Sequence, residues 1–173
     1  YLPDTIKATV VKQNLKNNPQ ADNYLKFIVQ ELKPFIDSAF STRTNQANTF
    51  IAGSSMGGLI SMYAICEYPK VFGGAACLST HWIGAIQQKN DYIPTAFAEY
   101  MVNNLPNPKN HTIYYDYGTI ELDSLYKRHQ LKVDDIMLKK GYKSKRWITK
   151  EFIGKNHSEK AWAQRFEIPI SFL

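Results

Sequence analysis

The sequence is poor in cysteine and has no hydrophobic run long enough to cross a bilayer. Its 173 residues include two cysteines, Cys66 and Cys77, each in an apolar stretch and without a Cys-x-x-Cys pair. We therefore expect two buried free thiols rather than a disulfide framework. The cysteines do not decide between a periplasmic, a secreted and a cytoplasmic location. Since no stretch of 18 apolar residues occurs, we expect no membrane-spanning helix.

Extreme charge and biased composition are also lacking. Charged residues make up 21% of the chain and hydrophobic residues 44%, as in a globular domain, and there is no internal repeat, low-complexity tract or linker. We therefore treat residues 1–173 as a single domain. The net charge is +6, and the densest basic cluster lies at residues 139–147. No nucleic-acid-binding module accompanies this cluster, so we interpret it as a solvated basic edge and expect no nucleic-acid partner.

What the sequence does contain is an alternation of helix-like and strand-like segments. After a polar, irregular lead-in at residues 1–20, apolar residues recur every three or four positions from Ala21, as on one face of a helix. Short apolar runs bounded by turn residues then alternate with helix-like stretches. The predicted strands are 49–53, 71–79, 111–118 and 146–154, and the predicted helices are 21–36, 59–65, 93–105, 125–141 and a closing segment at 159–173. This order predicts an α/β fold with a mostly parallel sheet covered by helices on both faces.

A Gly-x-Ser-x-Gly sequence lies between the first predicted strand and the helix that follows it. In the stretch IAGSSMGGLISMY, Gly53 and Gly57 flank Ser55 at the spacing of a nucleophile elbow, the tight strand-to-helix turn that lifts a serine hydroxyl above the sheet. Glycine suits a strained turn where neighbouring backbones approach closely. Ser55 is the candidate nucleophile, because the neighbouring Ser54 lacks the two flanking glycines. The N–H of Met56, at the start of the helix, would then be one oxyanion donor.

A serine nucleophile needs a base, and the sequence offers four histidines. His157 is the best candidate, because it follows the last predicted strand, and a loop at that edge of the sheet would hang over the elbow. His111 begins a strand and His129 lies within a helix, so we interpret both as structural. His81 follows the strand after the elbow and could line a substrate pocket together with Trp82.

The acid of a Ser–acid–His order should follow the strand before the one that precedes His157. Glu121 and Asp123 both lie in the loop beyond Gly118, and either could hold the imidazole in the required tautomer. Asp116 is within the strand and is expected to face elsewhere. The residues alone leave Glu121 and Asp123 open.

With these pieces in place, the chain resembles the esterase family of α/β-hydrolases, which includes esterase D-like, feruloyl esterase and enterochelin esterase-like enzymes. The resemblance begins near residue 20 and covers nearly all of the chain beyond it. The matching pieces are YLKFIVQELKPFID before the elbow, FIAGSSMGGLISMYA at the elbow, YYDYGTIELDSLY at the acid and HSEKAW at the histidine. The resemblance implies Ser55 as nucleophile and His157 as base. Similar feruloyl esterases have an Asp leading into Ser-Leu, which matches Asp123, although the loop here is about two residues longer and keeps Glu121 as the alternative.

The same resemblance implies a serine carboxylic-ester hydrolase that works through an acyl-enzyme on a Ser–His–Asp triad. No metal or organic cofactor is expected, and the sequence shows no metal-ligand spacing. The expected partner is a small-molecule or carbohydrate-linked ester. An acyltransferase using the same triad and a non-catalytic, hydrolase-like binding domain are the alternatives.

The start of the chain departs from the family pattern. Relatives have further strands and the first oxyanion loop ahead of the helix that begins near Ala21, and residues 1–20 supply neither. We therefore expect the chain, whose first residue is Tyr rather than Met, to be the C-terminal two-thirds of a longer domain. Alternatively, another chain completes the open edge of the sheet and supplies the second oxyanion donor, as in a homodimer.

Overall fold

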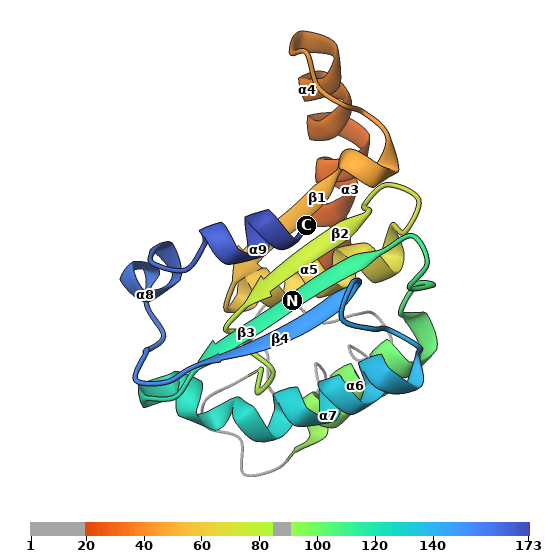
Figure 1. Cartoon of the computed structure of the whole chain (residues 1–173). Coiled ribbons are helices and arrows are strands. Elements are labelled where there is room, and N and C mark those ends of the chain that lie inside the picture. The colour runs from red at the N-terminus through yellow and green to blue at the C-terminus, as the bar shows by residue number, and fades with distance from the viewer. Residues whose placement is uncertain (1–19, 85–90) are drawn as a thin grey trace.

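The computed structural model describes residues 20–84 and 91–173, and its centre is a parallel sheet (Figure 1). The strands lie in chain order, β1-β2-β3-β4, and each neighbouring pair is parallel. Their bounds are β1 Phe50–Ser54, β2 Gly74–Leu78, β3 Thr112–Gly118 and β4 Trp147–Phe152. This arrangement confirms the predicted α/β fold. The predicted lead-in at residues 1–20 lies outside the described residues except for Gln20.

Helices connect the strands and flank the sheet. Their bounds are α3 Ala21–Phe27, the π-helical η2 Ile28–Leu32, α4 Lys33–Ala39, the short η3 Gln46–Asn48, α5 Met56–Glu67, α6 Tyr92–Asn104, η4 Glu121–Leu125, α7 Lys127–Lys139, α8 Glu159–Ala163 and α9 Glu167–Phe172. Helix α7 ends as predicted beside Gly141, whose φ of 85° is the left-handed conformation that commonly ends helices. None of the helices in the described parts of the chain is both long and apolar enough to cross a membrane.

Alternate residues of the central strands face two different apolar clusters. Ala75 and Ile113 belong to the larger cluster, which α5, α6 and α7 cover. Ala76 and Tyr114 belong to a smaller cluster on the opposite face, which the C-terminal helices α8 and α9 cover. Strands β2 and β3 are buried along their whole length, as central parallel strands must be. The prediction that helices cover both faces of the sheet is confirmed.

Strand β1 is an edge of the described sheet, and the helical segment beside it is largely exposed. Figure 1 shows α3 beside β1 and α4 extending away from the sheet. The apolar periodicity predicted this helix correctly, but only its first turns contact the core. Leu25 is fully buried, whereas Phe35 is 62% exposed and Phe50, on β1, is 43% exposed. A homodimer across this edge stays a prediction.

Strand β1 and helix α5 approach each other so closely at their junction that a side chain at position 53 has no room. A Cβ at Gly53 would lie 2.5 Å from the backbone C and O atoms of Gly57. A Cβ at Gly57 would meet no atom within 4 Å. Packing therefore requires the first glycine of the Gly-x-Ser-x-Gly sequence.

We expect Gly53→Ala to lower the free energy of unfolding by about 2 kcal/mol or more, because backbone atoms must move to admit the methyl group. Gly57→Ala is the matched control, since it adds the same group to a helix with open space and should raise the free energy of unfolding by up to about 1 kcal/mol. Urea unfolding followed by circular dichroism measures both changes. Equal stability of the two variants would contradict the close approach of β1 and α5.

Candidate active site

Ser55 occupies the bend between β1 and α5 in a backbone conformation that residues other than glycine rarely adopt. Its φ is 57° and its ψ is −119°. Its N–H donates to the carbonyl of Leu78 at 2.9 Å, and its own carbonyl accepts from the N–H groups of Gly58 at 3.0 Å and His81 at 3.2 Å. The first turn of α5 and the end of β2 thus hold the strained residue in place. This is the strand–turn–helix geometry of a nucleophile elbow.

Three side chains far apart in the sequence form one series of hydrogen bonds. Nε2 of His157 is 2.8 Å from Oγ of Ser55, and Nδ1 of the same ring is 2.5 Å from Oδ1 of Asp123. His157 lies in the loop between β4 and α8, at the carboxyl end of the parallel strands, where Ser55 also lies. The Asp123 side chain is 0% exposed and the His157 side chain 13% exposed. The arrangement shields the carboxylate from water and leaves part of the imidazole accessible.

Asp123 is a buried carboxylate whose hydrogen-bond donors come from the protein. Oδ2 accepts from the N–H of Gly118 at 2.6 Å and from Oγ of Ser79 at 2.5 Å, while Oδ1 faces His157. Burial acts to raise the pKa of Asp123, but the hydrogen bonds from His157, Ser79 and Gly118 outweigh burial and hold that pKa below its usual value. Asp123 is therefore ionised at neutral pH. It keeps a proton on Nδ1 of His157, so Nε2 accepts from Ser55.

The two carboxylates that the sequence left open lie in different environments. Both belong to the 3-10 turn η4. Glu121 is solvent-exposed, whereas Asp123 is fully buried against His157. Asp123 is therefore the carboxylate that contacts the imidazole.

His81 lies beside the site, but Trp82 does not. The His81 ring centre is 6.4 Å from that of His157, and Nδ1 of His81 is 2.7 Å from Oη of Tyr126. Burial and the nearby His157 lower the pKa of His81, so its ring is neutral at neutral pH. Trp82 points into the core instead: it is 2% exposed, and its Nε1 donates to Oε1 of Gln130 at 2.9 Å. This burial does not favour the prediction that Trp82 lines a substrate pocket together with His81, which stays a prediction.

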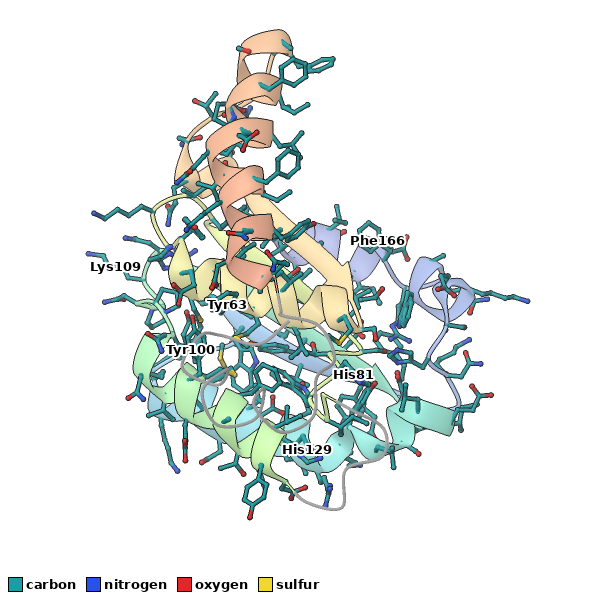
Figure 2. The ribbon with its side chains drawn as sticks, turned by 180° about the vertical axis from the view of Figure 1, so that it is seen from behind. Tyr63, His81, Tyr100, Lys109, His129 and Phe166 are labelled. Carbon is teal, nitrogen blue, oxygen red and sulfur yellow. The ribbon has the colours of Figure 1, made fainter. Side chains whose placement is uncertain are left out.

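The other two histidines have structural surroundings. Nδ1 of His111 is 2.8 Å from the backbone oxygen of Asn107, and its Nε2 is 2.8 Å from that of Pro69. His129 is buried on α7, where Figure 2 shows it in the helical layer, and its Nε2 accepts from Arg128 at 3.0 Å. Neither ring contacts Ser55, which agrees with their interpretation as structural residues.

Sequence reasoning missed the buried ion pair of Asp116 and Arg165, which lies close to Asp123. Asp116, which was expected to face away, lies on β3 with 0% exposure and forms a 2.8 Å ion pair with Nη2 of Arg165. Burial raises the pKa of Asp116, and Arg165 opposes that increase. Trp162 packs edge-on against His157 with ring centres 4.9 Å apart. The available signal was a carboxylate within a fully buried strand, which requires a cationic partner.

A metal site is not evident in the part of the chain that the structure describes. No group of three or more His, Cys, Asp or Glu residues there is placed to hold an ion.

The family model described as "Putative esterase" matches residues 4–167, which is nearly the whole chain. The chain belongs to this esterase family. Among curated proteins, the uncharacterized protein YjcH of Bacillus subtilis is 28% identical over 104 residues, covering 58% of this chain and 37% of that protein. Carboxylesterase SOBER1 of Arabidopsis thaliana is 39% identical over 51 residues, covering 30% of this chain and 22% of that protein. The chain thus spans well under half the length of these two relatives.

Solved structures of other esterases share the fold. The enterobactin esterase FES from Shigella flexneri matches with a TM-score of 0.66 at 18% identity, over 82% of this chain and 35% of that chain. An IroE-like serine hydrolase from Shewanella oneidensis matches with a TM-score of 0.64 at 24% identity, over 88% of this chain and 49% of that chain. These likenesses confirm the α/β-hydrolase-type architecture.

Breaking the buried pair of Asp116 and Arg165 should strongly destabilise the fold. We expect Arg165→Met to lower the free energy of unfolding by about 3–5 kcal/mol, because it leaves a buried carboxylate without its cation. Lys127→Met is the control: it removes one partner of the exposed 3.0 Å pair with Glu151 and should cost less than about 1 kcal/mol. Urea unfolding at neutral pH measures both values. Equal losses in the free energy of unfolding for the two variants would show that breaking the buried pair is no more destabilising than breaking the exposed one.

Proposed function

We propose that the chain carries the catalytic site of a serine carboxylic-ester hydrolase. The observation that carries the proposal is the series of hydrogen bonds from Oγ of Ser55 through His157 to Asp123. Membership of the esterase family and the serine hydrolases among the structural relatives support it. The Gly-x-Ser-x-Gly motif, the chain order of the three residues and their hydrogen-bond geometry all support the same serine, Ser55.

In the proposed first half-reaction, Oγ of Ser55 attacks the acyl carbon of the ester. Nε2 of His157 takes the Ser55 proton as the new C–O bond forms. The tetrahedral intermediate then collapses, its bond to the alcohol oxygen breaks, and His157 returns the proton to the departing alcohol. The acyl group remains on Ser55.

In the proposed second half-reaction, water replaces the alcohol. His157 accepts a proton from the water as its oxygen attacks the acyl carbon, and then delivers that proton to Oγ of Ser55. The products are a carboxylic acid and the free enzyme. Asp123 keeps its charge throughout, holds the Nδ1–H tautomer of His157 and stabilises the imidazolium that forms in both halves.

The proposed oxyanion donor is the N–H of Met56. Met56 is the first residue of α5, and the first N–H groups of a helix have no acceptor within it. The positive end of the helix dipole also favours a developing negative charge at this point. The second donor, expected from a loop that residues 1–20 do not supply or from another chain, stays a prediction.

Ser55 is the proposed nucleophile. We expect Ser55→Ala to lower kcat on p-nitrophenyl acetate by about 10⁴-fold or more, because no other hydroxyl takes its place. Ser54→Ala is the matched control and should change kcat by less than about threefold. A burst of p-nitrophenol with the wild-type chain would report the acyl-enzyme.

Equal rates for wild type and Ser55→Ala would favour a non-catalytic binding domain. Acyl transfer to an added alcohol, faster than release of free acid, would favour an acyltransferase instead. Enterobactin and esters of ferulic acid belong in the substrate panel, because the names of two structural relatives contain these compounds.

A separate prediction concerns the acid. We expect Asp123→Asn to lower kcat by about 10³- to 10⁴-fold, because an amide would favour the wrong tautomer of His157. Glu121→Gln removes the same charge two residues away on the exposed side of the turn and should leave kcat within about twofold. Steady-state kinetics of the two folded variants makes the comparison. A larger loss for Glu121→Gln would assign the acid to that residue.

A further inference from the structure

The hydroxyl of Ser79 lies at the centre of the buried polar residues beneath the proposed triad. Ser79 directly follows β2 and is 0% exposed. Its Oγ is 2.5 Å from Oδ2 of Asp123, 2.9 Å from Nε1 of Trp162 and 2.8 Å from Nη2 of Arg165. One small side chain thus joins the loop after β3 to the C-terminal helices.

The chemistry of these three contacts determines where the Ser79 proton points. An indole N–H and a guanidinium can only donate hydrogen bonds, whereas a hydroxyl has one proton and two lone pairs. Trp162 and Arg165 therefore occupy both lone pairs of the Ser79 oxygen. The single proton is left for the remaining contact, the carboxylate of Asp123.

This directed proton limits the orientation of the Asp123 carboxylate. Oδ2 receives both Ser79 and the N–H of Gly118, so only Oδ1 is left to face His157. Rotation of the carboxylate would break two short hydrogen bonds in a place that water does not reach. The position of Oδ1, and through it the orientation of the imidazole, thus depends on Ser79.

The backbone of Ser79 is itself held in an uncommon conformation. Its φ is 40°, in the left-handed region that non-glycine residues seldom occupy. Its N–H donates to the backbone oxygen of Asp116 at 2.9 Å and is 3.0 Å from Oδ1 of the same residue. Arg165 contacts both Asp116 and the Ser79 hydroxyl. The same ion pair therefore supports the backbone and the side chain of Ser79.

We infer that Ser79 is a positioning residue for Asp123, and that Trp162 and Arg165 act on the site by directing the Ser79 proton. This inference rests on the proposed function. Ser79 does not touch the substrate: it is fully buried and acts only through Asp123 and His157. The C-terminal segment consequently has two tasks, because it carries His157 and also orients the acid that holds His157.

The test is the kinetics of Ser79→Ala on p-nitrophenyl acetate. We expect kcat to fall about 10- to 100-fold, as is usual when an outer hydrogen-bond partner is lost, with KM changed by less than about twofold. The downfield NMR resonance of the His157 Nδ1 proton should shift or broaden, because its acceptor is no longer fixed. Tyr142→Phe is the control, because it removes another buried hydroxyl, which donates to the carbonyl of Pro106 at 3.0 Å. Pro106 and Tyr142 precede β3 and β4, whereas the proposed triad follows the strands, so this variant should leave kcat unchanged.

Ser79→Gly keeps the test decisive if the alanine variant folds poorly, because glycine accepts the positive φ of this position. The glycine variant should lose as much activity as the alanine variant, since both lack the hydroxyl. Full activity of the glycine variant would overturn the inference. So would a loss of activity that appears only as a raised KM.

A double-mutant cycle with Asp123→Ala separates this inference from the proposed function. If Ser79 acts through Asp123, Ser79→Ala should cost less than about twofold in kcat once Asp123 is absent. An equal cost in both backgrounds would overturn the positioning role. Ser55→Ala decides the proposed function independently: an inactive Ser55→Ala beside a fully active Ser79→Ala would reject the positioning role alone.

Discussion

Asp123 carries a negative charge in a place that water does not reach, and the surrounding structure is organised around that charge. A buried carboxylate is costly unless hydrogen bonds replace its hydration. Here Gly118, Ser79 and His157 supply them. Because each donor comes from a different element, the end of β2, the end of β3 and the loop after β4 must all be in place before the charge is satisfied.

The parallel sheet makes this convergence possible. The carboxyl ends of its strands meet at one edge, so Ser55, Ser79, Asp123 and His157 follow β1, β2, β3 and β4 respectively. Such an edge is where ligands bind in open α/β sheets, because several loops from adjacent strands lie within reach of one another. The order of the strands and the order of these four residues are thus the same. The segment after each strand contributes one polar side chain to the candidate site.

Sequence reasoning recovered the elements whose signals are local. The elbow was identified from Gly53, Ser55 and Gly57 between a strand-like and a helix-like stretch, and His157 from chain order. The residues alone did not distinguish Asp123 from Glu121 as the acid, because the direction of each carboxylate depends on the conformation of the turn η4. The direction of the Trp82 side chain could not be predicted, since side-chain direction in an irregular turn follows no period. Ser79 and Arg165 carry no local pattern at all: they contact each other across 86 positions of the chain.

The C-terminal segment covers its face of the sheet with the smaller of the two apolar clusters. Segments with few buried apolar contacts open at lower free energy than the main core. Detachment of α8 and α9 would remove Trp162 and Arg165 from Ser79 and would release the loop that bears His157, while β1 to β3 and α5 kept their contacts. Loss of the proposed ester hydrolysis on warming should therefore precede the collapse of the sheet, so that the assay reports a partial opening before any spectroscopic sign of unfolding.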